Sequence, residues 1–142
     1  IYHLWKDSGG VEHGLIVNKT ESTSVWQASS ILVGANRTED GVYNTSQMLA
    51  SPNACAAAIY ADNLGTGWYL PSIDELNLLW NNRFNTNTSL RAGGDTLLST
   101  SNYYWSSTEN STTLAYSFFF GNGYASSSGK NGTYSVRAVR AF

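Results

Sequence analysis

The feature that most constrains the fold of this chain is a long stretch near its carboxyl end that carries almost no charge. Of the 34 residues from Ser101 to Tyr134, 28 are Ser, Thr, Asn, Gly, Tyr or Phe, and only Glu109 and Lys130 are charged. Tyr and Phe favour strands, whereas Gly, Asn and Ser favour the turns between strands. We therefore predict strands joined by tight turns here, rather than a disordered low-complexity segment.

The predicted strands form a small antiparallel sheet in the last third of the chain. They cover Tyr103–Ser106, Leu114–Phe120 and Tyr134–Arg140. Near the amino end, alternating apolar residues interrupted by Ser8-Gly9-Gly10 predict a hairpin between Tyr2 and Val17.

Two helices are predicted between the hairpin and the sheet. A Ser-Pro pair at 51–52, followed by an Ala-rich run, predicts a helix over Asn53–Asp62. Ser72 and Glu75 have the spacing of a capping box, and apolar residues recur at helical spacing after them. A second helix is therefore predicted to begin at Ile73.

The polar stretch 18–44 is predicted to be a loop with short elements, and the stretch 81–98 is predicted to be a polar connection. Helices followed by a sheet give an α+β fold class, and 142 residues fit a single ligand-binding domain over 1–142. Because the chain opens at Ile1 without Met, we expect it to be a piece of a longer protein.

Composition argues against several classes of function. Charged residues make up 13% of the chain, against about 25% in a typical soluble protein, and no run of Lys or Arg occurs. We therefore expect no nucleic-acid partner, and without a long apolar run we expect no membrane insertion. Cys55 is the sole cysteine and lies among alanines, which predicts a buried apolar role rather than a reactive thiol.

No catalytic or metal-binding pattern stands out, so we predict that the protein is not an enzyme and holds no cofactor. Asp74 and Glu75 are explained by helix capping. Glu39 and Asp40 precede Gly41 in a turn-like setting, for which a solvated turn is favoured and a calcium-binding loop is the alternative.

Three motifs occur in order: GWYLPSIDEL at Gly67–Leu76, YWSSTE at Tyr104–Glu109 and VRAVRAF at Val136–Phe142. Together they resemble the C-terminal domain family of collagen-like bacterial adhesins. That family is similar to a C-type-lectin-fold branch shared with diversity-generating retroelement variable proteins and with formylglycine-generating enzymes. The resemblance runs from about His13 to the end of the chain, and to the enzymes it is one of fold only, since their catalytic cysteine pair has no counterpart.

The resemblance implies a C-type-lectin-like fold with two helices and a small antiparallel β-sheet. It further implies that the domain is displayed at the tip of a longer bacterial surface protein or phage tail fibre. The implied location is extracellular, at a cell surface or on a virion, and the implied oligomeric state is a homotrimer. Retroelement variable proteins scatter residue types such as Asn, Ser, Thr, Tyr and Phe over their ligand-contacting positions, and the stretch after Trp105 is rich in these types.

Strand alternation sorts part of that stretch into core and display positions. Phe118 and Phe120 are predicted to face the core and Ser117 and Phe119 to face outward, while Tyr116 shares the inward parity. Parity does not assign the turn positions, so their residues remain candidates by composition. The predicted ligand-binding residues are Asn110, Thr112, Thr113, Ser117, Phe119, Asn122, Tyr124, Ser126, Ser127, Ser128, Asn131, Thr133 and Tyr134.

Arg137 and Arg140 fall on opposite faces of a predicted strand, so at least one is expected to be buried and paired, with Glu75 or Glu109 as the expected carboxylate. Three tryptophans are predicted to be core rather than sugar-stacking platforms, namely Trp68, Trp80 and Trp105.

The sequence thus predicts a receptor-binding module with a hypervariable display surface in its C-terminal third. Tyr supplies rigid contact area, while Ser, Asn and Gly supply adaptable hydrogen bonds, although hairpin loops are rich in the same residues for purely structural reasons. The predicted partner is a cell-surface protein or glycan receptor. The alternative is a fixed-specificity bacterial adhesin domain that binds a host polysaccharide. A sulfated ligand would need clustered Lys and Arg, of which the chain has eight in all.

Overall fold

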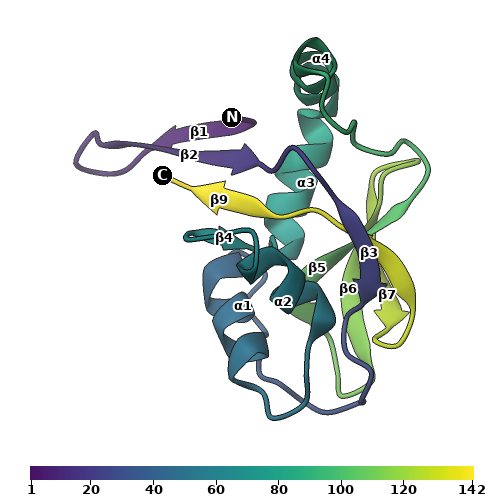
Figure 1. Ribbon diagram of the computed structural model, residues 1–142. Helices are drawn as coiled ribbons and strands as arrows, with labels where there is room; N and C mark the ends of the chain where they lie inside the picture. Colours follow the sequence, from purple (N-terminus) through teal and green to yellow (C-terminus); the bar gives the residue numbers. More distant parts are fainter.

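The computed structural model describes residues 1–142 and contains four helices and nine strands in two sheets (Figure 1). The strands are β1 His3–Lys6, β2 Glu12–Val17, β3 Ser22–Val25, β4 Trp68–Tyr69, β5 Tyr103–Glu109, β6 Leu114–Phe119, β7 Tyr124–Gly129, β8 Thr133–Val136 and β9 Val139–Ala141. The helices are α1 Gly41–Ala50, α2 Ala56–Asp62, α3 Ile73–Asn81 and α4 Arg83–Gly93. The predicted α+β class is confirmed, with two more helices than expected.

The smaller sheet has the strand order β1-β2-β9-β4 and gathers both ends of the chain. β1 and β2 form the predicted amino-terminal hairpin, and β9 pairs antiparallel with β2. Gly14 and Phe142 exchange backbone hydrogen bonds of 3.0 and 3.1 Å between their N–H and C=O groups. The amino and carboxyl termini therefore lie close together (Figure 1).

The larger sheet has the strand order β3-β8-β5-β6-β7. The hairpins β5-β6 and β6-β7 are antiparallel, but β5 and β8 run parallel, so the expected purely antiparallel sheet is wrong in this respect. The predicted single strand Tyr134–Arg140 is also wrong, because the chain leaves the larger sheet after Val136 and enters the smaller one at Val139. One segment thereby joins the two sheets.

Arg137 lies at this crossing and is fully buried. Its guanidinium donates to the carbonyl of Asn18 at 2.7 Å, to the carbonyl of Thr96 at 2.8 Å and to the carboxylate of Glu21 at 3.1 Å. Arg140 is exposed. The expected burial of one arginine is confirmed, but its carboxylate partner is Glu21 rather than Glu75 or Glu109.

Helix α3 begins where the sequence predicts. The Ser72 hydroxyl accepts from the Glu75 N–H at 3.3 Å, and the Glu75 carboxylate accepts from the Ser72 N–H at 2.7 Å, which completes the capping box. Helix α2 begins three residues later than predicted, with Cys55 at its N-cap. Ser51 closes α1 instead, its N–H donating to the Met48 carbonyl.

Helix α4 occupies the predicted 81–98 connection, and α1 begins inside the predicted 18–44 loop and runs beyond it to Ala50. At the start of α1, Asp40 accepts from the Tyr43 N–H at 2.8 Å, and Gly41 packs so closely on Ser72 and Glu75 that a side chain there would overlap them. Helix α4 buries Leu90 and ends at Gly94, whose φ of 71° is left-handed.

Two apolar clusters fill the interior. One joins α3 to the inner face of the larger sheet through Leu76, Leu79 and Phe118. The other surrounds α2 and contains Trp26 and Trp105. Trp105 is fully buried as predicted, while Trp68 and Trp80 pack against the clusters at their edges.

Helices α1, α2 and α3 all lie to one side of the larger sheet, and no helix covers its other side (Figure 1). None of the four helices has the length and apolar character needed to cross a membrane.

Candidate recognition surface

Four aromatic side chains form a continuous row across the uncovered side of the larger sheet. The aromatic row consists of Tyr124, Phe119, Tyr103 and Tyr134, from β7, β6, β5 and β8. Because Phe119 pairs with both Tyr103 and Tyr124 in register, these three side chains share one face. Ring centroids are 6.3 Å apart for Tyr124 and Phe119, 4.6 Å for Phe119 and Tyr103, and 5.4 Å for Tyr103 and Tyr134.

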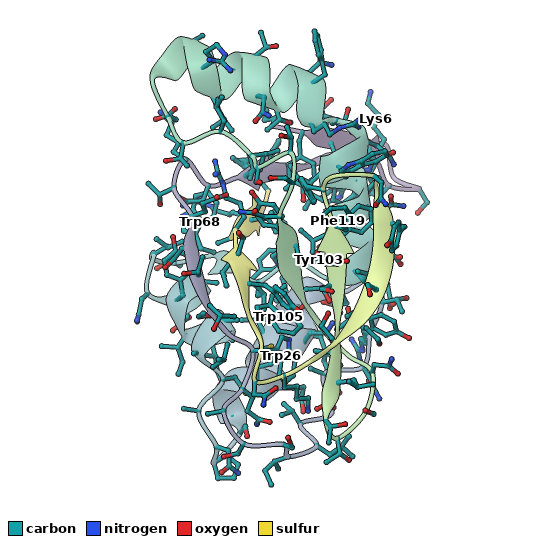
Figure 2. All side chains as sticks on the ribbon, turned by 90° about the vertical axis from the view of Figure 1, so that its right-hand side faces the viewer. Lys6, Trp26, Trp68, Tyr103, Trp105 and Phe119 are labelled. Atoms are coloured by element: carbon teal, nitrogen blue, oxygen red, sulfur yellow. The ribbon has the colours of Figure 1, made fainter.

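Figure 2 looks onto this face, where Tyr103 and Phe119 lie side by side above Trp105. Tyr103, Phe119 and Tyr134 are half-buried, and Tyr124 at the sheet edge is 51% exposed. Trp105 anchors the row from below, because its ring meets Tyr134 edge-on at 4.8 Å and its Nε1 donates to the Ser24 carbonyl at 3.1 Å. The row is therefore held rigidly while its outer faces reach solvent.

A shallow hollow of about 270 Å³ adjoins the row between Tyr103 and Tyr134. Its rim consists of uncharged hydrogen-bonding side chains, including Ser101, Asn102 and Thr133. Burial, together with the neighbouring phenols of Tyr124 and Tyr134, raises the pKa of Tyr103, so its hydroxyl stays protonated at neutral pH. The hollow thus offers aromatic area and hydroxyl groups without charge.

The two charges of the 101–134 segment both point inward. The Lys130 ammonium lies 2.6 Å from the Glu109 carboxylate, and both side chains are almost fully buried. Glu109 also accepts from the N–H groups of Val33 and Gly34 at 2.8 and 2.9 Å. This pair fastens the 27–38 connection to the end of the sheet and leaves the segment without an exposed charge.

Most of the sequence-predicted contact residues reach solvent. Those that are exposed are Asn110, Thr112, Thr113, Asn122, Tyr124, Ser127, Asn131 and Thr133, and those that are half-buried are Phe119, Ser126 and Tyr134. Ser117 and Ser128 are buried, and their hydroxyls hydrogen-bond to each other at 2.9 Å. Their expected exposure is wrong, because Ser117 lies in register beside Trp105 of β5, which is itself fully buried, and Ser128 is bonded to Ser117.

The exposed candidates do not all lie together. Asn110, Thr112 and Thr113 precede β6, whereas Asn122 follows it, so the two turns are separated by the length of a six-residue strand, roughly 20 Å. The aromatic row lies nearer the Asn122 end. A single small ligand cannot contact both turns, whereas a macromolecular surface can.

Tyr103 is the member of this surface that the sequence reasoning missed. The sequence predicts it only as the first residue of a strand. Its position two residues before Trp105 puts both side chains on the same face, and pairing with Phe119 would have revealed it.

The other residues considered as candidates for metal binding or catalysis have structural roles. Asp40 caps α1 and pairs with Arg37 at 2.9 Å, and no group of three or more His, Cys, Asp or Glu side chains is arranged to hold a metal ion. Cys55 is buried, and burial raises the pKa of its thiol to about 11, which makes it a poor nucleophile at neutral pH.

Comparison with known proteins gives one family and one informative structure. Residues 15–140 match the family model described as the Lcl C-terminal domain. No curated protein matches the sequence. A fimbrial protein from Bacteroides ovatus has a similar structure, with a TM-score of 0.73 and 21% sequence identity. The match covers 94% of this chain and 37% of that one, so this chain spans little more than a third of the fimbrial protein, and at this identity the likeness is one of fold.

Proposed function

The chain belongs to the Lcl C-terminal domain family of collagen-like adhesins, and from that premise we propose that it binds its receptor through the aromatic row and the hydroxyl and amide groups around it. The family and the fold it shares with a fimbrial protein support an adhesin-type role at a cell surface.

The observation that carries the proposal is the inward burial of Glu109 and Lys130. With those charges hidden, the segment presents only rigid aromatic area and short polar side chains, the combination that antibody contact surfaces use. Recognition of this kind depends on shape and hydrogen bonding. Binding to the receptor should therefore be nearly insensitive to ionic strength, because salt screens exposed charges and none takes part.

We further propose that this surface tolerates extensive sequence change, as the display surface of a retroelement variable protein does. Most of its exposed members lie in turns and on the edge strand β7, where substitutions cost within about 0.5 kcal/mol, whereas Trp105 and its neighbours fix the framework beneath. Sequencing the DNA around the gene tests this proposal. A near-copy of the 106–142 coding stretch that differs mainly at adenines, beside a reverse transcriptase, is expected, and its absence favours a fixed specificity.

Trimeric display would strengthen a weak single-site interaction by avidity. We include a homotrimer in the proposal on the strength of the family resemblance, and light scattering of the purified chain tests it.

Binding to whole cells and to a glycan array tests the role of the aromatic row. The variant Tyr103→Ser/Tyr124→Ser should lose most binding while its melting temperature stays within a few degrees of wild type. Phe142→Ser is the matched control, because Phe142 is a 47% exposed aromatic residue that directly follows β9 in the smaller sheet, outside the row. Unchanged binding by the row variant would refute the assignment.

A second function is favoured by the largest hollow of the structure, about 640 Å³, which lies against α4. Arg83 and Arg91 line it together with Phe84, and no carboxylate does. The Arg83 guanidinium is held 3.8 Å over the Trp80 ring. Two guanidinium groups on one helix suit a polyanionic host polysaccharide. In that case Arg83→Gln/Arg91→Gln would abolish binding, and binding by wild type would weaken steeply with added salt.

A further inference from the structure

The edge of the larger sheet at β7 is open. β7 is the last strand in the order β3-β8-β5-β6-β7, and β6 is the one strand that pairs with it. Figure 2 shows β7 as the outermost strand on its side of the sheet. An edge strand carries main-chain N–H and C=O groups that have no partner strand, so it can bind a further strand.

The direction of these main-chain groups follows from the pairing with β6. Lys130 directly follows β7, and its N–H donates to the Thr113 carbonyl at 3.0 Å, so these two residues are a hydrogen-bonded pair. In an antiparallel ladder such pairs alternate with non-bonded pairs. Counting back along the strand, Ser127 and Ala125 occupy non-bonded positions. Their N–H and C=O groups therefore point out of the sheet, both residues are exposed, and no backbone group from outside the ladder bonds to them.

This edge lacks the features with which proteins protect an edge strand, namely charged side chains, proline, bulges and short length. The β7 sequence YASSSG has no charge and no proline, and its register with β6 is continuous. The edge strands of the smaller sheet differ, because β1 has four residues and carries Lys6, and β4 has two residues. β7, with six residues, is the longest edge strand of the molecule.

We propose that β7 binds an extended, uncharged segment of the receptor as an added strand of the larger sheet. The inference rests on the proposed function, because the segment belongs to the receptor that contacts the aromatic row. Tyr124 lies on β7 and is 51% exposed, so an added strand lies directly beside the row and continues it. A charged segment is disfavoured, because its charges would lose water against a strand that offers no opposite charge.

A second copy of this chain is the less suitable occupant. Stable interfaces use about 20 to 30 residues on each side. β7 offers six residues, of which five are Ala, Ser or Gly, so a contact between two β7 strands alone buries little apolar surface. A receptor that covers the aromatic row as well as the edge reaches a larger area. Strand addition also agrees with a variable surface, since main-chain hydrogen bonds do not depend on the side chains of β7.

A capped peptide of six alternating Thr and Tyr residues is the probe, and it matches β7 in length. In NMR titrations of the isotope-labelled full chain, the peptide should shift the amide signals of Ala125 and Ser127. An analogue that is N-methylated at every internal residue lacks main-chain donors and should bind about ten-fold more weakly or worse. Equal binding of the two peptides, or no binding of the unmethylated peptide, would overturn the proposal.

Variants at the open positions separate main-chain from side-chain recognition. Ser127→Pro removes an outward N–H and no bond to β6, so the variant should fold and bind the peptide about ten-fold more weakly. Ser127→Ala is the matched control, because it also loses the hydroxyl that accepts from Asn110 but keeps the N–H, and it should bind within about two-fold of wild type. Ala125→Pro removes the other outward N–H and takes the place of Ser127→Pro if that variant does not fold. Undiminished binding in the folded proline variant, or an equal loss in Ser127→Ala, would overturn the proposal.

Binding to whole cells distinguishes this inference from the proposed function. Both Ser127→Pro and Tyr103→Ser/Tyr124→Ser should lose binding. If only the tyrosine variant loses it, strand addition is wrong and the role of the aromatic row stands, and if neither loses it, both proposals are wrong. Self-association of the wild-type chain that Ser127→Pro abolishes would identify a second copy as the occupant and overturn the receptor segment.

Discussion

Replacing Lys130 by Met tests whether the charges of the 101–134 segment are structural. In the native chain the Lys130 ammonium donates to Glu109 at 2.6 Å and to the Ile31 carbonyl at 2.9 Å, and it lies 4.7 Å from the centroid of the Trp26 ring. Met fills the volume of the aliphatic stem but removes the charge. The Glu109 carboxylate is then buried without its counter-ion.

The size of the effect follows from what remains around Glu109. Removing one partner of a buried ion pair costs about 3 to 5 kcal/mol. Because the N–H groups of Val33 and Gly34 still solvate Glu109, we expect the lower end, about 3 kcal/mol. In a chain of this length that loss lowers the melting temperature by roughly 10 °C. The double variant Lys130→Met/Glu109→Gln should recover part of the loss, because no charge is then buried.

Urea and thermal unfolding, followed by circular dichroism, measure these differences. The matched control is Lys19→Met. The Lys19 side chain is 74% exposed and lies 3.4 Å from Asp95, so its loss should cost less than about 1 kcal/mol. If Lys130→Met were equally mild, or if it weakened receptor binding without changing stability, Lys130 would belong to the contact surface and the neutral-surface argument would fail.

Three further outcomes are expected. A thiol reagent at about pH 8 should label Cys55 only after unfolding in urea, because burial raises its pKa to about 11, and rapid labelling of the native chain would contradict that burial. Gly123→Ala should lower the unfolding free energy by more than about 1 kcal/mol, because its φ is 81° and a Cβ would overlap the Trp80 ring; urea unfolding measures this, and a neutral result would refute the close packing. Wild type should lose stability relative to Glu75→Gln as pH rises above about 4.3, the pKa of a Glu side chain in the unfolded chain. Because the pKa of Glu75 is raised in the folded state, protonation of Glu75 stabilises the folded chain. This stabilisation is complete below the unfolded-state pKa and is lost as pH rises through the folded-state pKa. Unfolding curves at several pH values test the sign, and parallel pH profiles would argue against it.

The parts of the fold that could be predicted are those where local signals agree with the tertiary contacts. The hairpin of β1 and β2 combines alternation with a Gly turn, and α3 combines a capping box with an apolar face. These local signals were sufficient because each element is specified by residues within its own segment of sequence.

Helix α4 and strand β7 show where such signals fail. The α4 sequence RFNTNTSLRAG has many weak helix formers, and tertiary contacts stabilise it instead, such as the Asn87 side chain bonding to the N–H and C=O of Leu98 at 2.7 and 3.2 Å. Strand β7, YASSSG, is an edge strand, and its hydrogen bonds to β6 hold it without an apolar pattern. Neither type of contact is visible in a local window of sequence.

The residue types of the candidate surface could be predicted from the sequence, but the burial of each residue could not. Alternation correctly separated Phe118 from Phe119, because both follow the strand period. It did not reveal that Ser117 is covered, nor that Tyr103 completes the row, since both depend on the register between strands. The break between β8 and β9 was hidden for a similar reason, because the partners of Arg137 come from distant segments.

The adjacency of the chain ends has a practical consequence. A segment whose first and last strands lie in one small sheet can be spliced into a loop of a carrier protein without being stretched. Grafted in this way, it would be attached to the carrier through the smaller sheet, and the uncovered side of the larger sheet would face away from the carrier. Versions coupled to beads or grafted onto phage should therefore keep their receptor binding, whichever end of the chain carries the linker.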